Sequence, residues 1–356
     1  MRIAIVGVGL IGGSIGLAAR ERLGAEVAGW SRSAATRERA VQLGALDRAA
    51  GSLADAVAGA EAAFVCAPVG VLPEVLRETL AAAPGDCVVT DVGSTKRSVV
   101  EAISDPRFVG GHPLAGAETA GVEHARADLF ADATWYLTPA PGATGVLFER
   151  LHRLLRGLGA RPQTIDAASH DAMLAAVSHL PHVFANVLVA QAASALAEES
   201  EQLPATGPSF RDATRVAGAS SAIWTDIYLA NRDALGARLD DAIARLRAVR
   251  ELLASSDADA VTAWNDAAHD DRRRLLEAQL AGGELSELRV SVPNEPGVVA
   301  TLALELGKAG VNITDMALYP APDRTKGVVA LWIAGEEPAA RALELVERLG
   351  FPVARA

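Results

Sequence analysis

His112 is the residue best placed for acid–base chemistry in this sequence of 356 residues, which contains seven histidines. It stands in Gly110-Gly111-His112-Pro113, directly after the apolar run Phe108–Gly111, which predicts a β-strand. An imidazole with an ordinary pKa of about 6.5 can accept a proton at neutral pH. His112 is therefore the candidate general base. The alternative is a histidine that caps its strand through neighbouring backbone groups.

Two other polar segments also follow predicted strands. Pro68 comes after Ala62–Ala67, and Ser94 lies in Asp91-Val92-Gly93-Ser94-Thr95-Lys96, after Cys87–Asp91. Ligands of a doubly wound sheet bind outside the carboxyl ends of its strands, so both segments are expected beside a bound ligand. Ser94 either caps a helix only, or combines that role with one in the active site.

A second group of histidines occurs in a region of helical pattern. His170-Asp171 is followed by Ser178-His179-Leu180-Pro181-His182. His179 and His182 are three positions apart and are expected to share a helix face, with Pro181 kinking the helix. Such a pair is half of a metal site, but no third ligand at standard spacing accompanies it, so we predict no metal.

Two arginines downstream have the spacing of a carboxylate-binding pair. Arg211 and Arg215 lie four positions apart in Phe210-Arg211-Asp212-Ala213-Thr214-Arg215, on one helical face. A guanidinium can bind a carboxylate as a planar fork. The alternative is a salt-bridged surface turn. Trp224 follows and is either a pocket wall or part of the core.

A glycine pattern at the start of the chain predicts a nucleotide site. The predicted strand Ile3–Val6 is followed by Gly7-Val8-Gly9-Leu10-Ile11-Gly12 and by a small-residue helix at Gly13–Arg20. The first glycine allows a tight turn, the second lets backbone N–H groups approach a pyrophosphate, and the third lets helix and strand pack closely. The alternative is a purely structural turn. The candidate cofactor contacts here are Gly7, Gly9, Leu10, Ile11 and Gly12.

The second predicted strand indicates which cofactor is bound. It ends in Gly29-Trp30-Ser31-Arg32-Ser33 and lacks the acid that usually binds the ribose 2′-hydroxyl of NAD. An arginine flanked by hydroxyls suits a 2′-phosphate, so NADP is favoured over NAD. The alternative is a solvated Arg32 beside an NAD site in which Ser31 contacts the ribose.

The elements that must position these residues fall into three predicted domains. Residues 1–165 alternate β-branched runs with helical segments, which predicts a Rossmann-like, doubly wound α/β domain. Residues 166–283 are helical in pattern, and their long apolar stretches favour a homodimer. After a linker at Ala281-Gly282-Gly283, residues 286–356 follow the order βαββαβ, which predicts a ferredoxin-like module.

Composition excludes several classes of protein. The formal net charge of −11 disfavours nucleic acid and anionic membranes as partners. The two cysteines, Cys66 and Cys87, lie in apolar runs and suggest a reducing compartment, so we expect a cytoplasmic protein. The start Met1–Ala19 superficially resembles a secretory signal, but its glycine spacing has the separate explanation given above. Val183–Ala197 falls short of the ~20 residues of a membrane span.

Together these motifs resemble the prephenate/arogenate dehydrogenase family of tyrosine biosynthesis over nearly the whole chain. The C-terminal Val292-Pro293-Asn294-Glu295-Pro296-Gly297-Val298 and Gly310-Val311-Asn312-Ile313 resemble an ACT domain, a module that often binds an amino acid. The segments that carry the family resemblance are Gly7–Gly12, Asp91–Lys96, Gly111–Glu118, His170-Asp171, Ser178–His182 and Arg211–Ala217.

The resemblance implies a reaction and a role for each residue. Prephenate would give 4-hydroxyphenylpyruvate, or arogenate tyrosine, with loss of CO2 and hydride transfer to NAD(P)+. His112 would deprotonate the ring hydroxyl, and Ser94 would orient His112, the hydroxyl and the nicotinamide. Arg215 would hold a substrate carboxylate. The anionic pocket would be completed by His179, His182 and Arg211, with Glu118 gating or tuning it and Trp224 as a wall.

The ACT resemblance implies an effector. Asn294 is expected at the cap position before a helix and Gly297 in its first turn, where N–H groups and the helix dipole favour a carboxylate. Together with Asn312 these are the candidate effector contacts, and tyrosine is the expected feedback inhibitor. The alternative is a domain that only assembles subunits through sheet pairing.

Two other functions compete with this interpretation. NADP-dependent β-hydroxyacid dehydrogenases share the glycine loop but rely on a lysine in the helical domain, and residues 166–283 contain none. A non-catalytic sensor of nucleotide and amino acid would have no need for His112 together with His179, His182 and Arg215.

Overall fold

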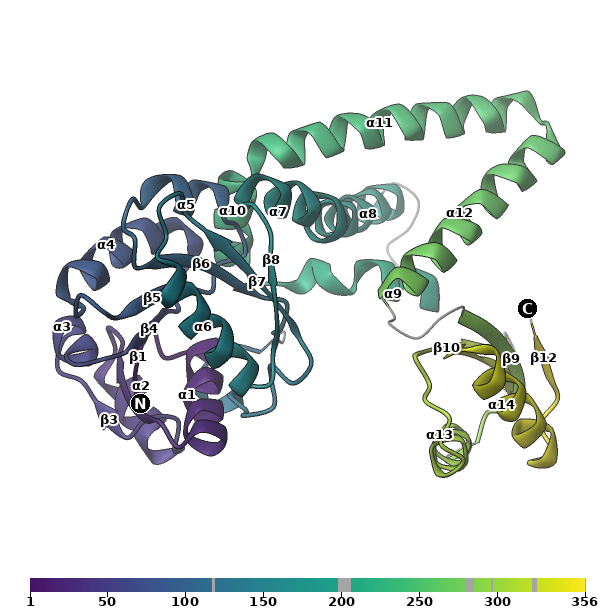
Figure 1. Ribbon diagram of the computed structural model, residues 1–356. Coiled ribbons are helices and arrows are strands. Elements are labelled where there is room, and N and C mark those ends of the chain that lie inside the picture. Colours follow the sequence, from purple (N-terminus) through teal and green to yellow (C-terminus); the bar gives the residue numbers. More distant parts are fainter. Residues whose placement is uncertain (117–118, 198–205, 280–284, 296, 322–324, 356) are drawn as a thin grey trace. The chain divides into compact units, whose positions relative to one another are not determined.

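A mostly parallel sheet organises the N-terminal half of the chain (Figure 1). The computed structural model describes residues 1–116, 119–197, 206–279, 285–295, 297–321 and 325–355. Within them, the sheet has the order β3-β2-β1-β4-β5-β6-β7-β8, and only β6 and β7 pair antiparallel. The first six strands follow the Rossmann order, which confirms the predicted doubly wound domain. The strands are β1 Arg2–Val6, β2 Glu26–Trp30, β3 Arg48–Ala49, β4 Ala62–Val65, β5 Val88–Asp91, β6 Phe108–Pro113, β7 Thr134–Pro139 and β8 Arg161–Thr164.

Helices cover both faces of this sheet because successive strand residues point to opposite sides. Ile3 and Ile5 of β1 pack with α1 (Leu10–Leu23), α2 (Ala34–Gln42) and α6 (Gly145–Gly157). Ala4 and Val6 face the opposite core, to which α3 (Leu53–Val57), α4 (Leu72–Ala82) and α5 (Arg97–Ala102) contribute. Short single turns occur at η1 (Val69–Val71) and η2 (Val122–His124). The two-residue β3 was not predicted, because it is too short to show a strand pattern.

A helical region follows the sheet. It begins with α7 (Ala167–Leu174), a π-helical turn η3 (Ala175–His179) and α8 (Leu180–Ala197). The predicted kink at Pro181 thus takes the form of a widened turn just before the proline, which removes one N–H from the helix ladder. The remaining elements are α9 (Pro208–Thr214), the 3₁₀ turn η4 (Arg215–Gly218), α10 (Ser221–Ala230), α11 (Arg232–Ser255) and α12 (Ala258–Gln279).

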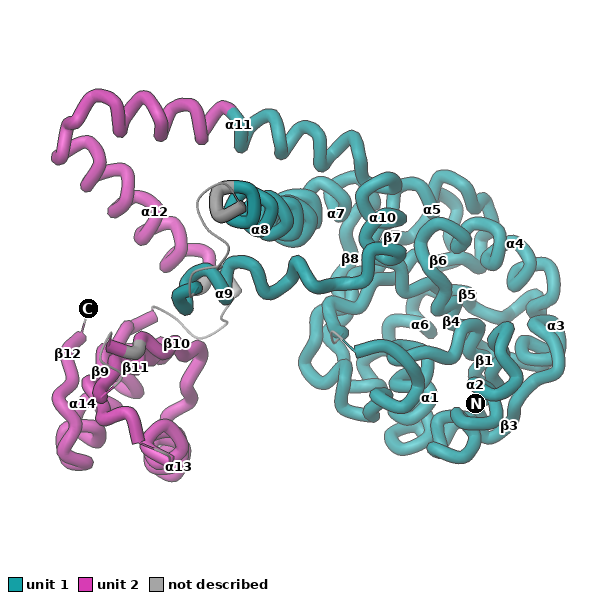
Figure 2. The backbone as a smooth tube through the Cα atoms, turned by 180° about the vertical axis from the view of Figure 1, so that it is seen from behind, with its two compact units in different colours: residues 1–243 teal, residues 244–356 magenta. Residues whose placement is uncertain are grey.

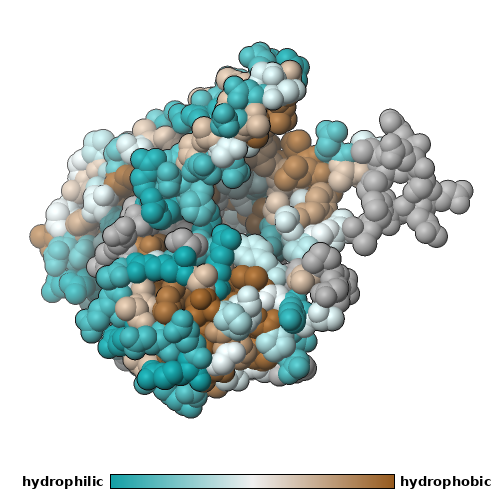
Figure 3. All heavy atoms as spheres, turned by 90° about the vertical axis from the view of Figure 1, so that its right-hand side faces the viewer, coloured by the Kyte–Doolittle hydropathy of each residue, from teal (hydrophilic) through white to brown (hydrophobic). Residues whose placement is uncertain are grey.

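The helical region exposes much apolar surface. By length and composition alone, one stretch among the described residues, Ala167–Ser194, is long and apolar enough to cross a membrane, with a mean hydropathy of 1.5. Exposed apolar residues lie along several of its helices. Figure 3 shows one face of the molecule, with apolar patches between hydrophilic ones. These residues include Val187, Leu188 and Val189 on α8, Ile223 and Leu229 on α10, and Ile243, Leu246 and Leu253 on α11.

The chain divides into two compact units, residues 1–243 and 244–356, with the division inside α11 (Figure 2). In the second unit, an antiparallel sheet of order β10-β11-β9-β12 is present among the described residues. Its elements follow the predicted order βαββαβ, and the predicted linker 281–283 lies outside the described residues. They are β9 Leu285–Pro293, α13 Val298–Lys308, β10 Asp315–Pro320, β11 Lys326–Ala334, α14 Glu336–Arg348 and β12 Val353–Arg355.

One detail of the second unit differs from the prediction. The N-cap of α13 is Gly297, with φ +92°, and Asn294 lies three residues before it. A positive φ of this size is open to glycine and strained for asparagine, so the chain turns into the helix at Gly297. Asn294 is therefore not the capping residue, and Gly297 precedes the first turn of α13.

Candidate active site

The glycine turn between β1 and α1 has the geometry of a phosphate-binding loop. Gly7 has φ +101°, and a Cβ there would lie 2.2 Å from the Cys66 carbonyl oxygen. A Cβ on Gly12 would lie 2.1 Å from the Gly7 carbonyl oxygen, so helix and strand approach as closely as predicted. Gly9 is the N-cap of α1, and a Cβ on it would meet no atom within 4 Å. The N-terminus of α1 is thus open to an anion.

A cavity of about 510 Å³ lies beside this turn. Ser31, Arg32 and Pro68, which were predicted to contact the cofactor, line it together with Gly7 and Gly9. Leu10, Ile11 and Gly12 are not among its lining residues, because they lie in the first turn of α1 behind the loop. The free thiol of Cys66 also lines the cavity, and burial raises its pKa well above the ordinary range. The residues present fit a dinucleotide.

The end of β2 brings one arginine, Arg32, to the edge of the cavity, and a second, Arg37, lies nearby on α2. Arg32 is exposed, and Arg37 donates a hydrogen bond from Nη1 to the Ser31 carbonyl oxygen. Ser33 caps α2 by accepting a hydrogen bond from the Thr36 N–H at 3.2 Å. The Arg32 guanidinium and the N-terminus of α2 therefore lie at the edge of the cavity next to the end of β2.

His112 lies inside a strand and not just after one. Strand β6 continues to Pro113 because it pairs with β7, with His112 opposite Tyr136. The His112 side chain is 8% exposed, and its Nδ1 lies 2.9 Å from Nε2 of His170. This contact leaves Nε2 of His112 as the ring nitrogen available to a ligand.

His170 and Asp171, at the start of the helical region, determine how His112 is protonated. His170 Nδ1 lies 2.8 Å from Oδ1 of Asp171. Because the carboxylate accepts, His170 donates from Nδ1, and its neutral ring can only accept at Nε2. His112 must then donate from Nδ1, which leaves its Nε2 unprotonated. The three side chains thus fix His112 in the tautomer that a general base needs.

Asp171 is itself held by the start of α5. It accepts hydrogen bonds from the backbone N–H of Lys96 at 2.7 Å and of Arg97 at 2.9 Å. The N-cap position of α5 is Lys96, so Ser94 does not cap this helix; Asp171 supplies the missing acceptors from another element. Ser94 itself is half-buried in the segment between β5 and α5.

The surroundings of His112 keep its ring neutral. Burial lowers its pKa well below 6.5, and the nearby His170, Lys96 and His179 lower it further. A base with a lowered pKa remains unprotonated at pH values below 6.5. We therefore expect the acidic limb of the pH profile to lie below the ordinary histidine range.

His179 and His182 meet around Trp224 of α10. The His182 ring stacks on Trp224 with centroids 3.5 Å apart, and His179 meets Trp224 edge-on at 6.0 Å. Asn231 donates from Nδ2 to Nδ1 of His179 at 3.1 Å, and Tyr228 forms a hydrogen bond with Nδ1 of His182. Each neutral ring therefore carries its proton on Nε2.

The Nε2 atoms of His179 and His182 are buried and, among the described residues, neither forms a hydrogen bond of normal geometry, although the His182 ring interacts with the Val216 backbone. Burial lowers the pKa of His179 to about 4 and also lowers that of His182, which the Val216 backbone partly offsets. Buried donors without partners are costly unless a ligand accepts from them. The pair therefore suits an anionic ligand.

The predicted arginines lie beside this pair. Turn η4, which begins at Arg215, packs against α8, and the neighbouring Val216 backbone lies next to His182. Arg215 and Arg211 are both exposed, and Arg211 donates to the Thr206 carbonyl oxygen at 3.2 Å. Glu118 lies outside the described residues. Among those residues, no group of three or more His, Cys, Asp or Glu side chains is placed to hold a metal ion.

The structure brings together residues that were predicted separately. His112 contacts His170, which contacts Asp171. Asn231 links this series to the next one, because it donates from Nδ2 both to the Asp171 carbonyl oxygen, at 2.8 Å, and to His179. His179 and His182 both contact Trp224. His170 and Asp171 stand out in the sequence as a His-Asp pair at the start of a predicted helix, but no role was predicted for either residue. Asn231 and Tyr228 were not predicted, because nothing in their sequence surroundings marks them as functional.

Comparison with known proteins identifies the family of this chain. Residues 15–164 match the family described as prephenate dehydrogenase, nucleotide-binding domain, and residues 166–265 match its dimerization domain. A prephenate dehydrogenase of Bacillus subtilis is 32% identical over 355 residues, which cover 97% of this chain and 95% of that protein. A cyclohexadienyl dehydrogenase of Zymomonas mobilis is 35% identical over 265 residues, covering 72% of this chain and 90% of that protein.

Solved structures give the same result. Prephenate dehydrogenase from Aquifex aeolicus, in complex with hydroxyphenyl propionate and NAD+, superimposes with a TM-score of 0.72 at 27% identity, over 76% of this chain and 97% of that one. Synechocystis arogenate dehydrogenase gives a TM-score of 0.68 at 28% identity, over 77% of this chain and all (100%) of that one. With its glycine turn, its histidine series and these relatives, the chain belongs to the prephenate dehydrogenase family of NAD(P)-dependent enzymes.

Proposed function

We propose that this enzyme oxidises and decarboxylates prephenate or arogenate with His112 as the general base. The observation that carries the proposal is the series His112–His170–Asp171, which leaves Nε2 of His112 unprotonated. NAD(P)+ bound at the glycine turn supplies the hydride acceptor. The substrate is a cyclohexadienol with a ring hydroxyl opposite a ring carboxylate.

The chain's own contribution is to bind the substrate and to move one proton. As hydride leaves the hydroxyl-bearing carbon, that carbon becomes electron-poor and the hydroxyl proton shifts to Nε2 of His112. Loss of CO2 returns an electron pair to the ring, and the proton goes back to the oxygen of the phenol product. The positive charge on His112 is shared with His170 and faces the Asp171 carboxylate, 2.8 Å from His170.

The direct test offers prephenate and arogenate with each nicotinamide in turn and follows the absorbance of the reduced cofactor. We expect turnover with at least one of the four combinations, together with release of CO2. If no combination is turned over by a folded, cofactor-binding protein, the proposed reaction is wrong.

The substrate carboxylate is expected to bind beside Trp224. The buried Nε2 groups of His179 and His182 supply neutral donors, and Arg215, with Arg211 one helical turn before it, supplies positive charge. Glu118 stays a predicted gating residue. Ser94 is proposed to orient His112 and the hydroxyl, from the segment between β5 and α5.

We expect Arg215→Gln to raise the KM for substrate by ~10–150-fold, because a hydrogen bond to a charged group is worth roughly 1.5–3 kcal/mol. The KM for the cofactor should not change. Arg250→Gln, an exposed arginine on α11, serves as the matched control and should have wild-type kinetics. An unchanged substrate KM in Arg215→Gln would remove this residue from the binding site.

The cofactor is proposed to be NADP in preference to NAD. Support comes from Arg32, which lines the cavity just after β2, and from the absence of an acid in Trp30–Ser33. Both nucleotides share the glycine turn, so they differ only at the 2′ position.

Arg32→Ala should raise the KM for NADP by roughly 10-fold or more and leave the KM for NAD almost unchanged, because only NADP carries the 2′-phosphate that this guanidinium would bind. Arg39→Ala, further along α2, is the control for a lost surface charge. A wild-type KM for NAD that is already lower than that for NADP, together with an unchanged ratio in Arg32→Ala, would reverse the assignment.

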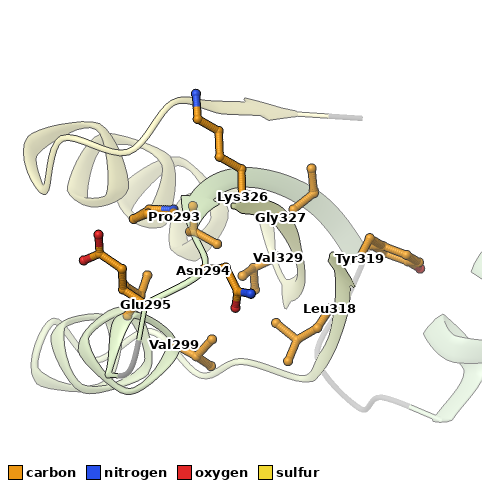
Figure 4. A pocket seen from close by; sticks show the side chains of 12 residues that line it. Pro293, Asn294, Glu295, Val299, Leu318, Tyr319, Lys326, Gly327 and Val329 are labelled. Atoms are coloured by element: carbon orange, nitrogen blue, oxygen red, sulfur yellow. The ribbon is translucent and has the colours of Figure 1, made fainter. Parts of the chain in front are cut away.

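The C-terminal module is proposed to be an ACT domain that binds tyrosine. A cavity of about 250 Å³ lies between the end of β9, α13 and strands β10 and β11. Figure 4 shows the Asn294 amide pointing into the space between Val299, Leu318 and Val329. Gly297 and Asn312 are not among the lining residues, so Asn294 is the candidate contact that carries the proposal.

Tyrosine is expected to lower the rate and to raise the melting temperature of the full-length enzyme, because a ligand that binds only the folded state stabilises it. Asn294→Ala should weaken both effects together. If tyrosine changes neither the rate nor the melting temperature, the module has only a structural role.

The apolar surface of the helical region is proposed to be covered by a second copy of the chain. Residues 166–265 match a family region described as a dimerization domain, and exposed apolar residues occur on α8, α10 and α11 within that range. The stretch with membrane-like composition also carries His170, Asp171, His179 and His182, which are buried in polar contacts. A dimer in the cytoplasm accounts for both features, and sedimentation of the purified protein tests it.

A further inference from the structure

Two charged side chains are completely buried next to His112, and the reaction described above does not use them. Asp91 ends β5, Lys96 precedes α5, and both are 0% exposed. Lys96 Nζ donates to Oδ2 of Asp91 and, at 2.8 Å, to the Gly111 carbonyl oxygen. Asp91 accepts from the backbone N–H of Gly93 at 2.8 Å and of Gly111 at 3.0 Å.

Stability alone is a poor explanation for this pair. Removing two charges from water costs free energy that their attraction often fails to recover, and apolar replacements are frequently as stable. The sequence is also selective at this position: of its 33 basic residues only Lys96, Lys308 and Lys326 are lysines. Among the lysines and arginines that the structure describes, the fully buried one is therefore a lysine, whose ammonium is compact.

The geometry points to His112. Gly111 directly precedes it, and the pair binds both polar groups of Gly111: Asp91 accepts from its N–H and Lys96 donates to its C=O. The backbone N–H of Lys96 also donates to Asp171, which binds His170, the partner of His112. The Asp91–Lys96 pair thus contacts the backbone next to His112 and, through the Lys96 N–H, the Asp171 carboxylate that binds His170.

We propose that the Asp91–Lys96 pair is a positioning device that aims the His112 ring at the substrate. The proposal rests on the role of His112 as the base. Neither Asp91 nor Lys96 touches the reacting atoms. The charged and titratable groups around His112 are His170 and Asp171 of α7, His179 of the π-helical turn, Asp91 of β5, Lys96 before α5 and Tyr136 of β7.

The sign of the electrostatic effect follows from these groups. The Lys96 ammonium repels a second positive charge, so it lowers the pKa of His112 in addition to burial and His170. If this cation is removed, the imidazolium costs less and the pKa of His112 rises. A larger fraction of the enzyme is then protonated and inactive at mildly acidic pH.

The test measures kcat/KM against pH for Lys96→Met and for the double variant Asp91→Asn/Lys96→Met, which leaves no uncompensated buried charge. In Lys96→Met, we expect the acidic limb to move to higher pH, with the largest loss of rate at low pH. In the double variant the move should be smaller, because losing the Asp91 charge acts in the opposite direction, whereas the loss of kcat should remain. Lys96→Arg keeps the charge but not the compact ammonium. It should keep the wild-type acidic limb and lose kcat. Lys308→Met removes an exposed lysine and is the matched control.

A wild-type pH profile and kcat in either folded Lys96→Met variant would overturn the proposal. If neither variant folds, the pair belongs to the stability of the sheet, and the proposal is equally wrong. His112→Asn separates this failure from that of the base itself. An inactive His112→Asn beside an unaltered Lys96→Met profile rejects only the positioning role, whereas an active His112→Asn rejects the role of His112 on which the inference depends.

Discussion

His112→Asn should lower kcat by roughly 10²–10⁴-fold, which is the usual contribution of a general base. Asparagine fills a similar space and can still form a hydrogen bond with a substrate hydroxyl, but it cannot take up the proton. The KM for substrate and cofactor should change little. His112 lies apart from the residues that line the cavity at the glycine turn and from the group formed by His182 and Trp224.

The pH profile distinguishes the loss of a base from a general disturbance of the site. In His112→Asn, the acidic limb caused by histidine protonation should disappear, leaving a low and nearly pH-independent rate. His269→Asn, at an exposed histidine of α12, is the control and should keep the wild-type profile. A kcat close to wild type above pH 7 would show that another group accepts the proton.

Asp171→Asn should be almost as damaging, although Asp171 contacts neither substrate nor cofactor in our proposal. The carboxylate accepts three N–H groups: His170 Nδ1, Lys96 N and Arg97 N. Either orientation of an asparagine amide places its NH2 group against at least one of these donors. With the NH2 group at the Oδ1 position, His170 must accept at Nδ1, which reverses both tautomers and puts a proton on Nε2 of His112. With the NH2 group at the Oδ2 position, the tautomers are kept, but the negative charge that stabilises a protonated His112 is lost. We expect kcat to fall by roughly 10²-fold or more.

The matched control for this change is Asp166→Asn. Asp166 is the N-cap of α7 and accepts from the Ser169 N–H at 2.9 Å, so it shares the capping role of Asp171 but not the contact with His170. Both variants should lose some thermal stability, and only Asp171→Asn should lose its rate. If the two variants retain similar activity, Asp171 acts through capping alone.

The nucleotide site could be predicted because its geometry is local. Gly7 and Gly12 are required by contacts within the same turn, with the Cys66 and Gly7 carbonyl oxygens, and a strand followed by that spacing permits few other arrangements. His112 was selected as the candidate base for a similar reason: an apolar strand was followed by a polar residue. Its exact place inside β6 was missed because the pairing with β7 extends the strand.

The support of the base could not be predicted because it depends on distant contacts. His112 and His170 are 58 residues apart, and Asp171 caps a helix that begins more than seventy residues earlier. Nothing in the local pattern shows that these segments meet. Lysine is also rarely buried, so the default expectation for Lys96 is a surface position. The one local hint was an acid and a lysine five residues apart at the end of a buried strand.

In the C-terminal module, the order of the elements could be predicted, but the residue at which one helix begins could not. Alternation of apolar residues was sufficient to give the order of strands and helices. The start of α13 was placed on Asn294 by its capping preference, whereas the backbone turns at Gly297. Asparagine and glycine are both common N-cap residues, so residue type alone does not distinguish Asn294 from Gly297. The positive φ of Gly297 does.

The π-helical turn at Ala175–His179 has a consequence for how this segment tolerates change in length. It accommodates one residue more than an ordinary turn, so α7 and α8 are out of phase by about 100°, the rotation that one residue adds. His170 and His182 lie on either side of this turn and contact their partners with this offset in place. Any insertion or deletion between them would rotate one end of the active site away from the other, even where every side chain is retained.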